Sequence, residues 1–116
     1  MITWKELVDT QTVDEIVGLS SQTPYLIFKH STRCSISAMA KMRLEHSWDF
    51  GADEIQPYYL DLIAFRQVSN YIAEKFSVYH ESPQALLIWQ GECIYDASHL
   101  DISVPELKEA LAALHS

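Results

Sequence analysis

Several residue types are scarce in this 116-residue chain, and each scarcity excludes a class of protein. Two cysteines, far apart in the sequence, are too few for the disulfide framework of a small secreted domain. With three glycines and four prolines, the chain has no flexible linker or low-complexity tract. No apolar run approaches the roughly 20 residues of a membrane-spanning helix, and the N-terminus lacks the apolar core of a signal peptide. We therefore expect a soluble, cytoplasmic protein with reduced thiols and no membrane partner.

Basic residues are scarce as well. The chain has 8 Lys and Arg against 16 Asp and Glu, for a formal net charge of -8. Because binding to phosphate backbones needs a basic surface, we expect no nucleic-acid partner. The length fits one domain over residues 1–116, and a hydrophobic content of 48% is enough for an ordinary core.

Apolar patterning predicts helices and strands in alternation. A short helix is expected near Thr12 and Glu15, which have the spacing of a capping box, and it should end near Gly18. The later elements are a buried strand at 25–28, a helix from about 34 to 49, a strand at 57–62, a helix at 65–76, a hairpin of 85–89 and 93–95 around Gln90-Gly91, and a last helix that Pro105 opens.

The order of these elements is α, then β-α-β, then α, then β-β-α. A strand, a crossover helix and a parallel strand followed by a terminal hairpin and helix is the thioredoxin arrangement. The sequence thus predicts an α/β, thioredoxin-like fold with a central mixed four-stranded sheet flanked by helices. A fold does not by itself assign a function, which depends on the motifs that the fold carries.

Cys34 lies where the first buried strand gives way to a helix. The free N–H groups and the dipole of a helix N-terminus favour a thiolate, which is the nucleophile in disulfide exchange. Lys29 and Arg33 add positive charge nearby, and residues 16–44 hold four basic and no acidic residues, while the remainder carries a net -12. A cysteine that only fills space is an equally common reading of such a position.

The residue three positions after Cys34 is Ser37, where a dithiol site would have its second cysteine. Serine cannot resolve a mixed disulfide, so the motif requires a monothiol mechanism in which another molecule supplies the second thiol. Cys93 begins the second strand of the hairpin, about 15 Å from the end of the sheet that carries Cys34. A disulfide needs Cα atoms about 5 to 6 Å apart, so Cys93 is interpreted as structural.

Two further features belong to the same end of the sheet. Pro83 precedes a strand that should run antiparallel to the strand before Cys34, which brings Pro83 and Cys34 together. His30 is expected to order the loop or to tune Cys34 by hydrogen bonding. The spacings of the five histidines match no zinc pattern, so no metal is expected.

The segments Phe28-Lys29-His30-Ser31-Thr32-Arg33-Cys34-Ser35-Ile36-Ser37, His80-Glu81-Ser82-Pro83-Gln84 and Ser98-His99 resemble the monothiol bacilliredoxins, also called the YtxJ proteins of the bacillithiol system. The resemblance covers nearly the whole chain. It implies a thioredoxin-like fold, removal of bacillithiol from S-thiolated proteins, and a stress-response role. Bacillithiol or another low-molecular-weight thiol would be the co-substrate.

The resemblance also implies residue roles. Cys34 would be the nucleophile, Pro83 a cis proline, and Ser82 the residue whose backbone holds the extended substrate chain. The active-site loop and thiolate stabilisation would involve Lys29, His30, Thr32, Arg33, Ser35 and Ser37. Family members often have proline directly after the cysteine, whereas this chain has Ser35, which keeps a backbone N–H that could support the thiolate.

Two functions from different classes therefore remain open. One is a monothiol oxidoreductase that uses Cys34. The other is a redox-inactive, thioredoxin-like protein-binding module. The reactivity of Cys34 toward alkylating agents at neutral pH distinguishes them.

Overall fold

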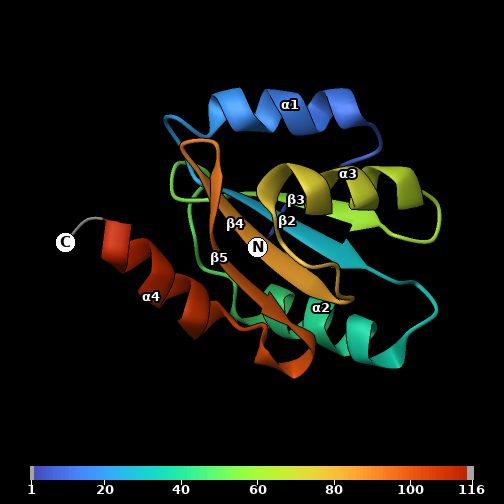
Figure 1. Cartoon of the computed structure of the whole chain (residues 1–116). Coiled ribbons are helices and arrows are strands. Elements are labelled where there is room, and N and C mark those ends of the chain that lie inside the picture. Colours follow the sequence, from blue (N-terminus) through green and yellow to red (C-terminus); the bar gives the residue numbers. More distant parts are fainter. Residues whose placement is uncertain (1, 115–116) are drawn as a thin grey trace.

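The computed structural model describes residues 2–114; Met1, His115 and Ser116, which the predicted domain includes, lie outside the described part. Its elements (Figure 1) are β1 (Lys5–Glu6), α1 (Thr10–Leu19), β2 (Tyr25–His30), α2 (Ser35–Ser47), β3 (Gln56–Asp61), α3 (Arg66–Phe76), β4 (Gln84–Trp89), β5 (Glu92–Ser98), the 3₁₀ turn η1 (His99–Asp101) and α4 (Val104–Leu114). None of the helices in residues 2–114 combines the length and the apolar composition needed to cross a membrane.

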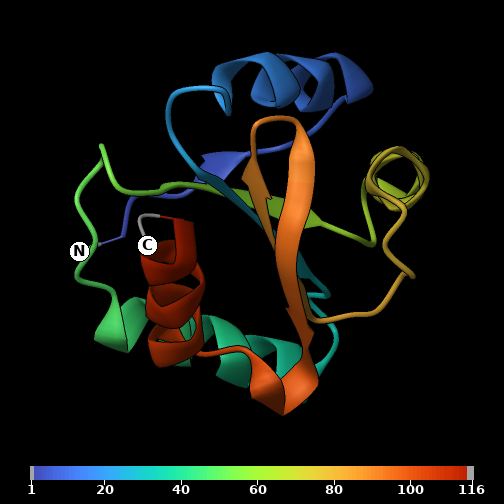
Figure 2. The ribbon, with the colours of Figure 1, turned by 60° about the vertical axis from the view of Figure 1, so that its left-hand side comes forward.

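The strands form one mixed sheet in the order β1-β3-β2-β4-β5. β1, β3 and β2 are parallel, whereas β4 and β5 are antiparallel to their neighbours. Helices α1 and α3 cover one face of this sheet, and α2 and α4 cover the other (Figures 1 and 2). The predicted α/β fold with a mixed central sheet flanked by helices is confirmed. The predicted strand count is corrected from four to five, because β1 has only two residues, both exposed, and therefore no apolar alternation to reveal it.

Both faces of the sheet are apolar, which explains the uninterrupted hydrophobic run in β2. All six residues of β2 are buried. Leu26 and Phe28 point toward α2 and α4, whereas Ile27 points toward α1 and α3. A strand that is covered on both faces has no polar side, so its sequence loses the alternation of a surface strand.

The structure confirms one predicted local signal, a turn, and contradicts another, a helix cap. Gln90 and Gly91 have positive φ angles of 52° and 80° and form the tight turn between β4 and β5, as predicted. The capping box at Thr12 was wrong. Asp9 is the N-cap of α1 and accepts a hydrogen bond from the Thr12 N–H at 2.7 Å, so the helix begins at Thr10 and includes Gly18.

Lys29 is the one cation that the sheet buries completely among residues 2–114. Its Nζ donates to the backbone oxygen of Ser69 in α3 at 3.1 Å and lies 3.4 Å from Nδ1 of His80. No carboxylate within the described residues forms an ion pair with it. Burial lowers the pKa of Lys29 from its ordinary value of 10.5 to about 8.

Because of this lowered pKa, the free energy of unfolding should change with pH in the alkaline range. Between pH 8 and 10.5 the unfolded chain binds more protons at Lys29 than the folded chain, so the free energy of unfolding should rise across that window. We expect urea denaturation to show that the free energy of unfolding rises from pH 7 to pH 10 more in the wild type than in Lys29→Met, which has no such group. The difference between the two increases should be on the order of 2 kcal/mol. Every other titratable group is present in both proteins, so the comparison isolates Lys29. Parallel pH profiles for the two proteins would contradict the assignment.

Candidate functional site

Cys34 occupies the N-cap of α2, directly after the loop that follows β2. Its backbone is extended (φ -113°, ψ 121°), its N–H donates to the oxygen of Ser31 at 3.2 Å, and its carbonyl accepts from the N–H of Ala38 at 3.1 Å. The residue is half-buried and its thiol is free. The N–H groups of the first turn of an α-helix have no partners within the helix, so the positive end of the α2 dipole lies at this cysteine.

Ser37 fills the position that a second cysteine would take, and its hydroxyl is fully buried. The Oγ atom accepts a hydrogen bond from the N–H of Ser31 at 3.0 Å and lies 2.6 Å from Nδ1 of His30. One side chain therefore connects the end of β2, the loop and the first turn of α2. This connection fixes the loop that presents Cys34.

His30 is held on the α2 face of the sheet between two aromatic rings. Its ring centroid lies 5.9 Å from that of Phe28 and 5.5 Å from that of Tyr59, and the residue is 7% exposed. Burial, and secondarily the nearby charge of Lys41, lowers the pKa of His30, so the ring is neutral at neutral pH. The Ser37 hydroxyl has one proton to donate and two lone pairs, so it can bond to His30 Nδ1 while it accepts from the Ser31 N–H. No local pattern predicted a role for Tyr59, because only the pairing of β3 with β2 brings it here.

The remaining predicted loop residues divide into two groups. Thr32, Arg33 and Ser35 lie exposed on the loop and the first turn of α2, beside Cys34. Lys29 does not join them. Because side chains alternate along a strand, Lys29 projects from the face opposite to His30, and its ammonium contacts α3. The positive charge that the sequence suggested beside Cys34 has no support from Lys29 in this structure.

The segment before β4 reaches the same end of the sheet. The Ser82–Pro83 peptide bond is cis, and Pro83 is buried. Lys29 pairs with Gln84, which sets Pro83 level with the last residue of β2 and with the loop that carries Cys34. The predicted proximity at one end of the sheet is therefore confirmed. The hydroxyl of Ser82 is buried and has no hydrogen-bond partner among residues 2–114.

Cys93 lies at the other end of the sheet, as predicted. It pairs with Ile88 in β4, which in turn pairs with Tyr25 at the start of β2. Its thiol donates to the backbone oxygen of Tyr95 at 3.3 Å. Burial raises the pKa of the Cys93 thiol to about 11, so this sulfur is a poor nucleophile at neutral pH.

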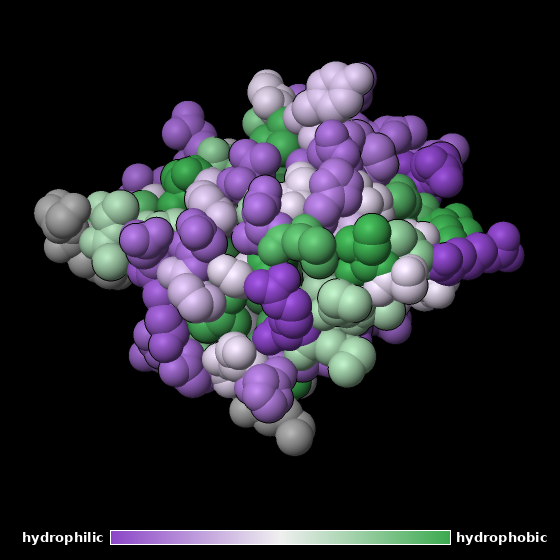
Figure 3. All heavy atoms as spheres, turned by 90° about the horizontal axis from the view of Figure 1, so that it is seen from below, coloured by the Kyte–Doolittle hydropathy of each residue, from purple (hydrophilic) through white to green (hydrophobic). Residues whose placement is uncertain are grey.

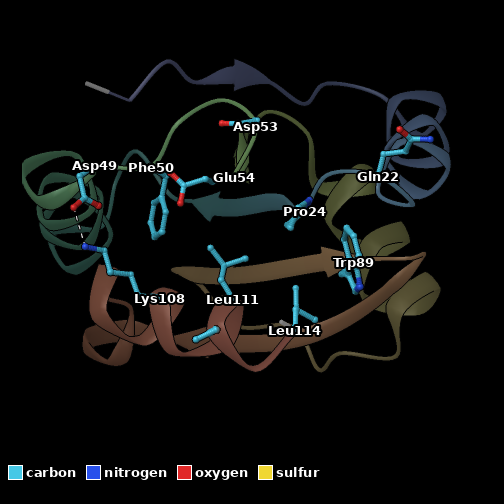
Figure 4. Close-up of a pocket in the computed structure, with 11 residues that line it drawn as sticks. Gln22, Pro24, Asp49, Phe50, Asp53, Glu54, Trp89, Lys108, Leu111 and Leu114 are labelled. Atoms are coloured by element: carbon cyan, nitrogen blue, oxygen red, sulfur yellow. Dashed lines mark hydrogen bonds and ion pairs between the residues drawn. The ribbon is translucent and has the colours of Figure 1, made fainter. Parts of the chain in front are cut away.

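A hollow of about 450 Å³ also lies at that far end, between the α2–β3 loop, the end of β4 and α4 (Figure 4). Phe50, Trp89 and Leu111 give it apolar walls, and an ion pair of 2.8 Å between Lys108 and Asp49 lies at one side. Cys34 takes no part in it. Within residues 2–114 no group of three or more potential ligand side chains is arranged to hold a metal ion.

Known proteins share both the sequence pattern and the fold. Residues 5–107 match the family model described as monothiol bacilliredoxin BrxC. A solved structure described as a candidate oxidoreductase with a thioredoxin fold is 31% identical, with a TM-score of 0.75 and coverage of 90% of both chains. The Malassezia sympodialis thioredoxin is 14% identical, with a TM-score of 0.75 over 100% of this chain and 94% of that one. Spinach chloroplast thioredoxin f is 18% identical, with a TM-score of 0.68 over 97% and 93%. The two thioredoxins show the fold alone.

The family match runs from β1 into α4 and so includes the Cys34 loop and the cis proline. It agrees with the thioredoxin-like fold and with the 31% identity to a thioredoxin-fold protein, and together these support the role of a thiol oxidoreductase. The chain belongs to the monothiol bacilliredoxin family.

Proposed function

We propose that this protein is a monothiol thiol–disulfide oxidoreductase that removes bacillithiol, or another low-molecular-weight thiol, from S-thiolated proteins. One observation carries the proposal. The half-buried Cys34 at the N-terminus of α2 has no second thiol within reach, because position 37 is a serine and Cys93 lies at the other end of the sheet.

The proposed reaction has two exchange steps. In the first, the Cys34 thiolate attacks the sulfur of the small thiol in a protein mixed disulfide, a new S–S bond joins Cys34 to the small thiol, and the substrate cysteine leaves as a thiolate. In the second, another molecule of small thiol attacks that bound sulfur and leaves with it as a symmetric disulfide. Each cycle therefore consumes one free small thiol, the disulfide bond passes from the substrate to the symmetric disulfide, and Cys34 leaves as the restored thiolate.

Neighbouring groups would assist this exchange. The first-turn N–H groups, including that of Ser35 where proline would have none, stabilise a thiolate at the helix terminus. Arg33 is exposed and attracts the carboxylates of bacillithiol. The backbone of Ser82, beside the cis proline, would pair with the extended chain of the substrate. A cycle that restores a free thiol needs a reducing compartment, and we propose the cytoplasm.

The first test is adduct formation with bacillithiol disulfide. We expect intact mass to show one bacillithiol per chain in the wild type and in Cys93→Ser, and none in Cys34→Ser. Iodoacetamide at pH 7 should modify Cys34 and spare Cys93, whose pKa of about 11 keeps it protonated. A folded protein in which Cys34 resists alkylation at pH 7 would overturn the enzymatic proposal and favour a redox-inactive binding module.

The second test restores the missing thiol. In Ser37→Cys, the new cysteine follows Cys34 by about one helical turn. This spacing brings the two Cα atoms to the separation of about 5 to 6 Å that a disulfide requires. We expect this variant to expel bound bacillithiol and to form an internal disulfide, which intact mass and thiol titration would detect.

Ser37→Ala is the matched control, because it loses the same bonds to His30 and Ser31 without gaining a thiol. Both variants should be destabilised by about 1 to 3 kcal/mol, since a buried partner is left unsatisfied. The control should retain its adduct. If Ser37→Cys also kept its adduct, the assignment of position 37 as the place of the missing second cysteine would be refuted.

A further inference from the structure

Large apolar side chains are exposed at nine positions within residues 2–114, and four of these lie close together. Ile36, Met39 and Met42 belong to α2, and Leu100 belongs to η1, which packs against α2. We call these four residues the apolar α2 patch. Figure 3 views the molecule from the α2 side and shows hydrophobic side chains grouped among hydrophilic ones on this face.

The patch does not contribute to the core. The opposite face of α2, with Ala40 and Leu44, already packs against the sheet. The exposed fractions of Ile36, Met39 and Met42 are 43%, 53% and 68%. An exposed helix face is normally polar. In α2, apolar side chains lie on the exposed face as well as on the face that packs against the sheet. An apolar surface of this kind marks an interaction site.

A hollow of about 580 Å³ extends the patch into the space between α2 and the start of α4. Its walls include Met39, Met42, Arg43, His46, Val104 and Pro105. Methionine side chains are flexible and polarisable, so one such hollow can accept apolar side chains of different shapes.

Two arginines, Arg33 and Arg43, are available at this side of the molecule, although the whole chain carries -8. Arg33 is exposed and forms no ion pair with any residue of the described part. The Nη1 of Arg43 donates to the backbone oxygen of Leu100 at 3.0 Å, and its guanidinium lines the hollow. Acidic residues also adjoin the patch: Asp96, Asp101 and Glu106 line a second hollow with Arg43 and Leu100, and Glu45 lines a third with Met42. A partner whose carboxylate meets Arg43 while its apolar side chains meet Met39 and Met42 complements the part of this surface that the first hollow forms.

The patch lies within reach of any chain that presents a disulfide to Cys34. Met39 and Met42 follow Cys34 by five and eight residues, which is about 7 and 12 Å along the helix axis at 1.5 Å per residue. An extended polypeptide advances about 3.3 Å per residue. Side chains about two to four positions from the modified cysteine therefore reach the patch.

From these observations we infer that the apolar α2 patch docks the protein substrate. The segment it receives has apolar side chains and a carboxylate two to four residues from its thiolated cysteine. The inference rests on the function proposed for Cys34, and it assigns to α2 the selection among S-thiolated proteins, which the reacting disulfide itself does not provide.

The kinetic test uses two synthetic peptides, each with one cysteine joined to bacillithiol. One peptide has Leu and Asp two to four positions from the cysteine, and the other has Ser and Lys there. For each protein variant, the second-order rate with a peptide is divided by the rate with bacillithiol disulfide, which removes changes in the reactivity of Cys34.

We expect Met39→Ser/Met42→Ser to lower this ratio about tenfold for the Leu–Asp peptide, since two apolar contacts are lost. Val8→Ser/Leu19→Ser is the matched control. It changes two exposed apolar residues outside the patch, and its ratio should not change. An equal ratio in the wild type and in the methionine variant would overturn the inference.

Charge exchange tests the electrostatic part. Arg43→Glu should lower the ratio for the Leu–Asp peptide and raise it for the Ser–Lys peptide, and both effects should weaken at high salt because exposed charges are screened. A variant that treats the two peptides as the wild type does would contradict the proposed complementarity.

A binding measurement separates this inference from the proposed chemistry. Cys34→Ser protein is titrated with the Leu–Asp peptide whose cysteine is replaced by serine, and NMR shifts are followed at the patch. Binding that Met39→Ser/Met42→Ser weakens supports docking even if Cys34 proves inert, in which case only the proposed function fails. Concentration-dependent dimerisation that the methionine variant abolishes would assign the patch to a second copy of this chain and overturn the inference.

Discussion

The buried hydroxyl of Ser37 is the contact on which the geometry around Cys34 depends. Ser37 belongs to the first turn of α2. Its hydroxyl contacts His30, the last residue of β2, and the N–H of Ser31 in the loop, so it connects all three segments. His30 is itself fixed between the rings of Phe28 and Tyr59, so the anchor of this loop reaches into β3. Buried polar groups are stable only when they are satisfied, and here each one satisfies another.

Local patterns were sufficient to predict the elements that carry the site. An apolar run at 25–28 followed by polar residues and a second helical pattern located Cys34 at a strand–helix junction, and the structure makes it the N-cap of α2. The antiparallel hairpin located Pro83 and Cys93 at opposite ends of the sheet. These predictions succeeded because each depends on a short segment or on the pairing of neighbouring strands. The cis geometry at Pro83 came from family resemblance.

The predictions that failed depend on distant contacts. The distribution of charge along the sequence predicts that Lys29 lies near Cys34. Side chains alternate along β2, however, so Lys29 projects from the other face of the sheet. Two-residue strands such as β1 exist only because a neighbouring strand offers an edge. Helical periodicity alone does not show which residues of α2 the rest of the chain leaves exposed, and Ile36, Met39 and Met42 prove to be among them.

The remote position of Cys93 has a consequence for stoichiometry. A protein with two neighbouring thiols can store an oxidising equivalent internally and release its cargo at once. If this chain acts as we propose, its second sulfur is too far away for such storage, and Cys34 would hold the small thiol that it accepts. Under the proposed exchange, the fraction of molecules carrying an adduct at equilibrium is set by the ratio of reduced to oxidised small thiol, so the protein would also report the redox balance of its surroundings.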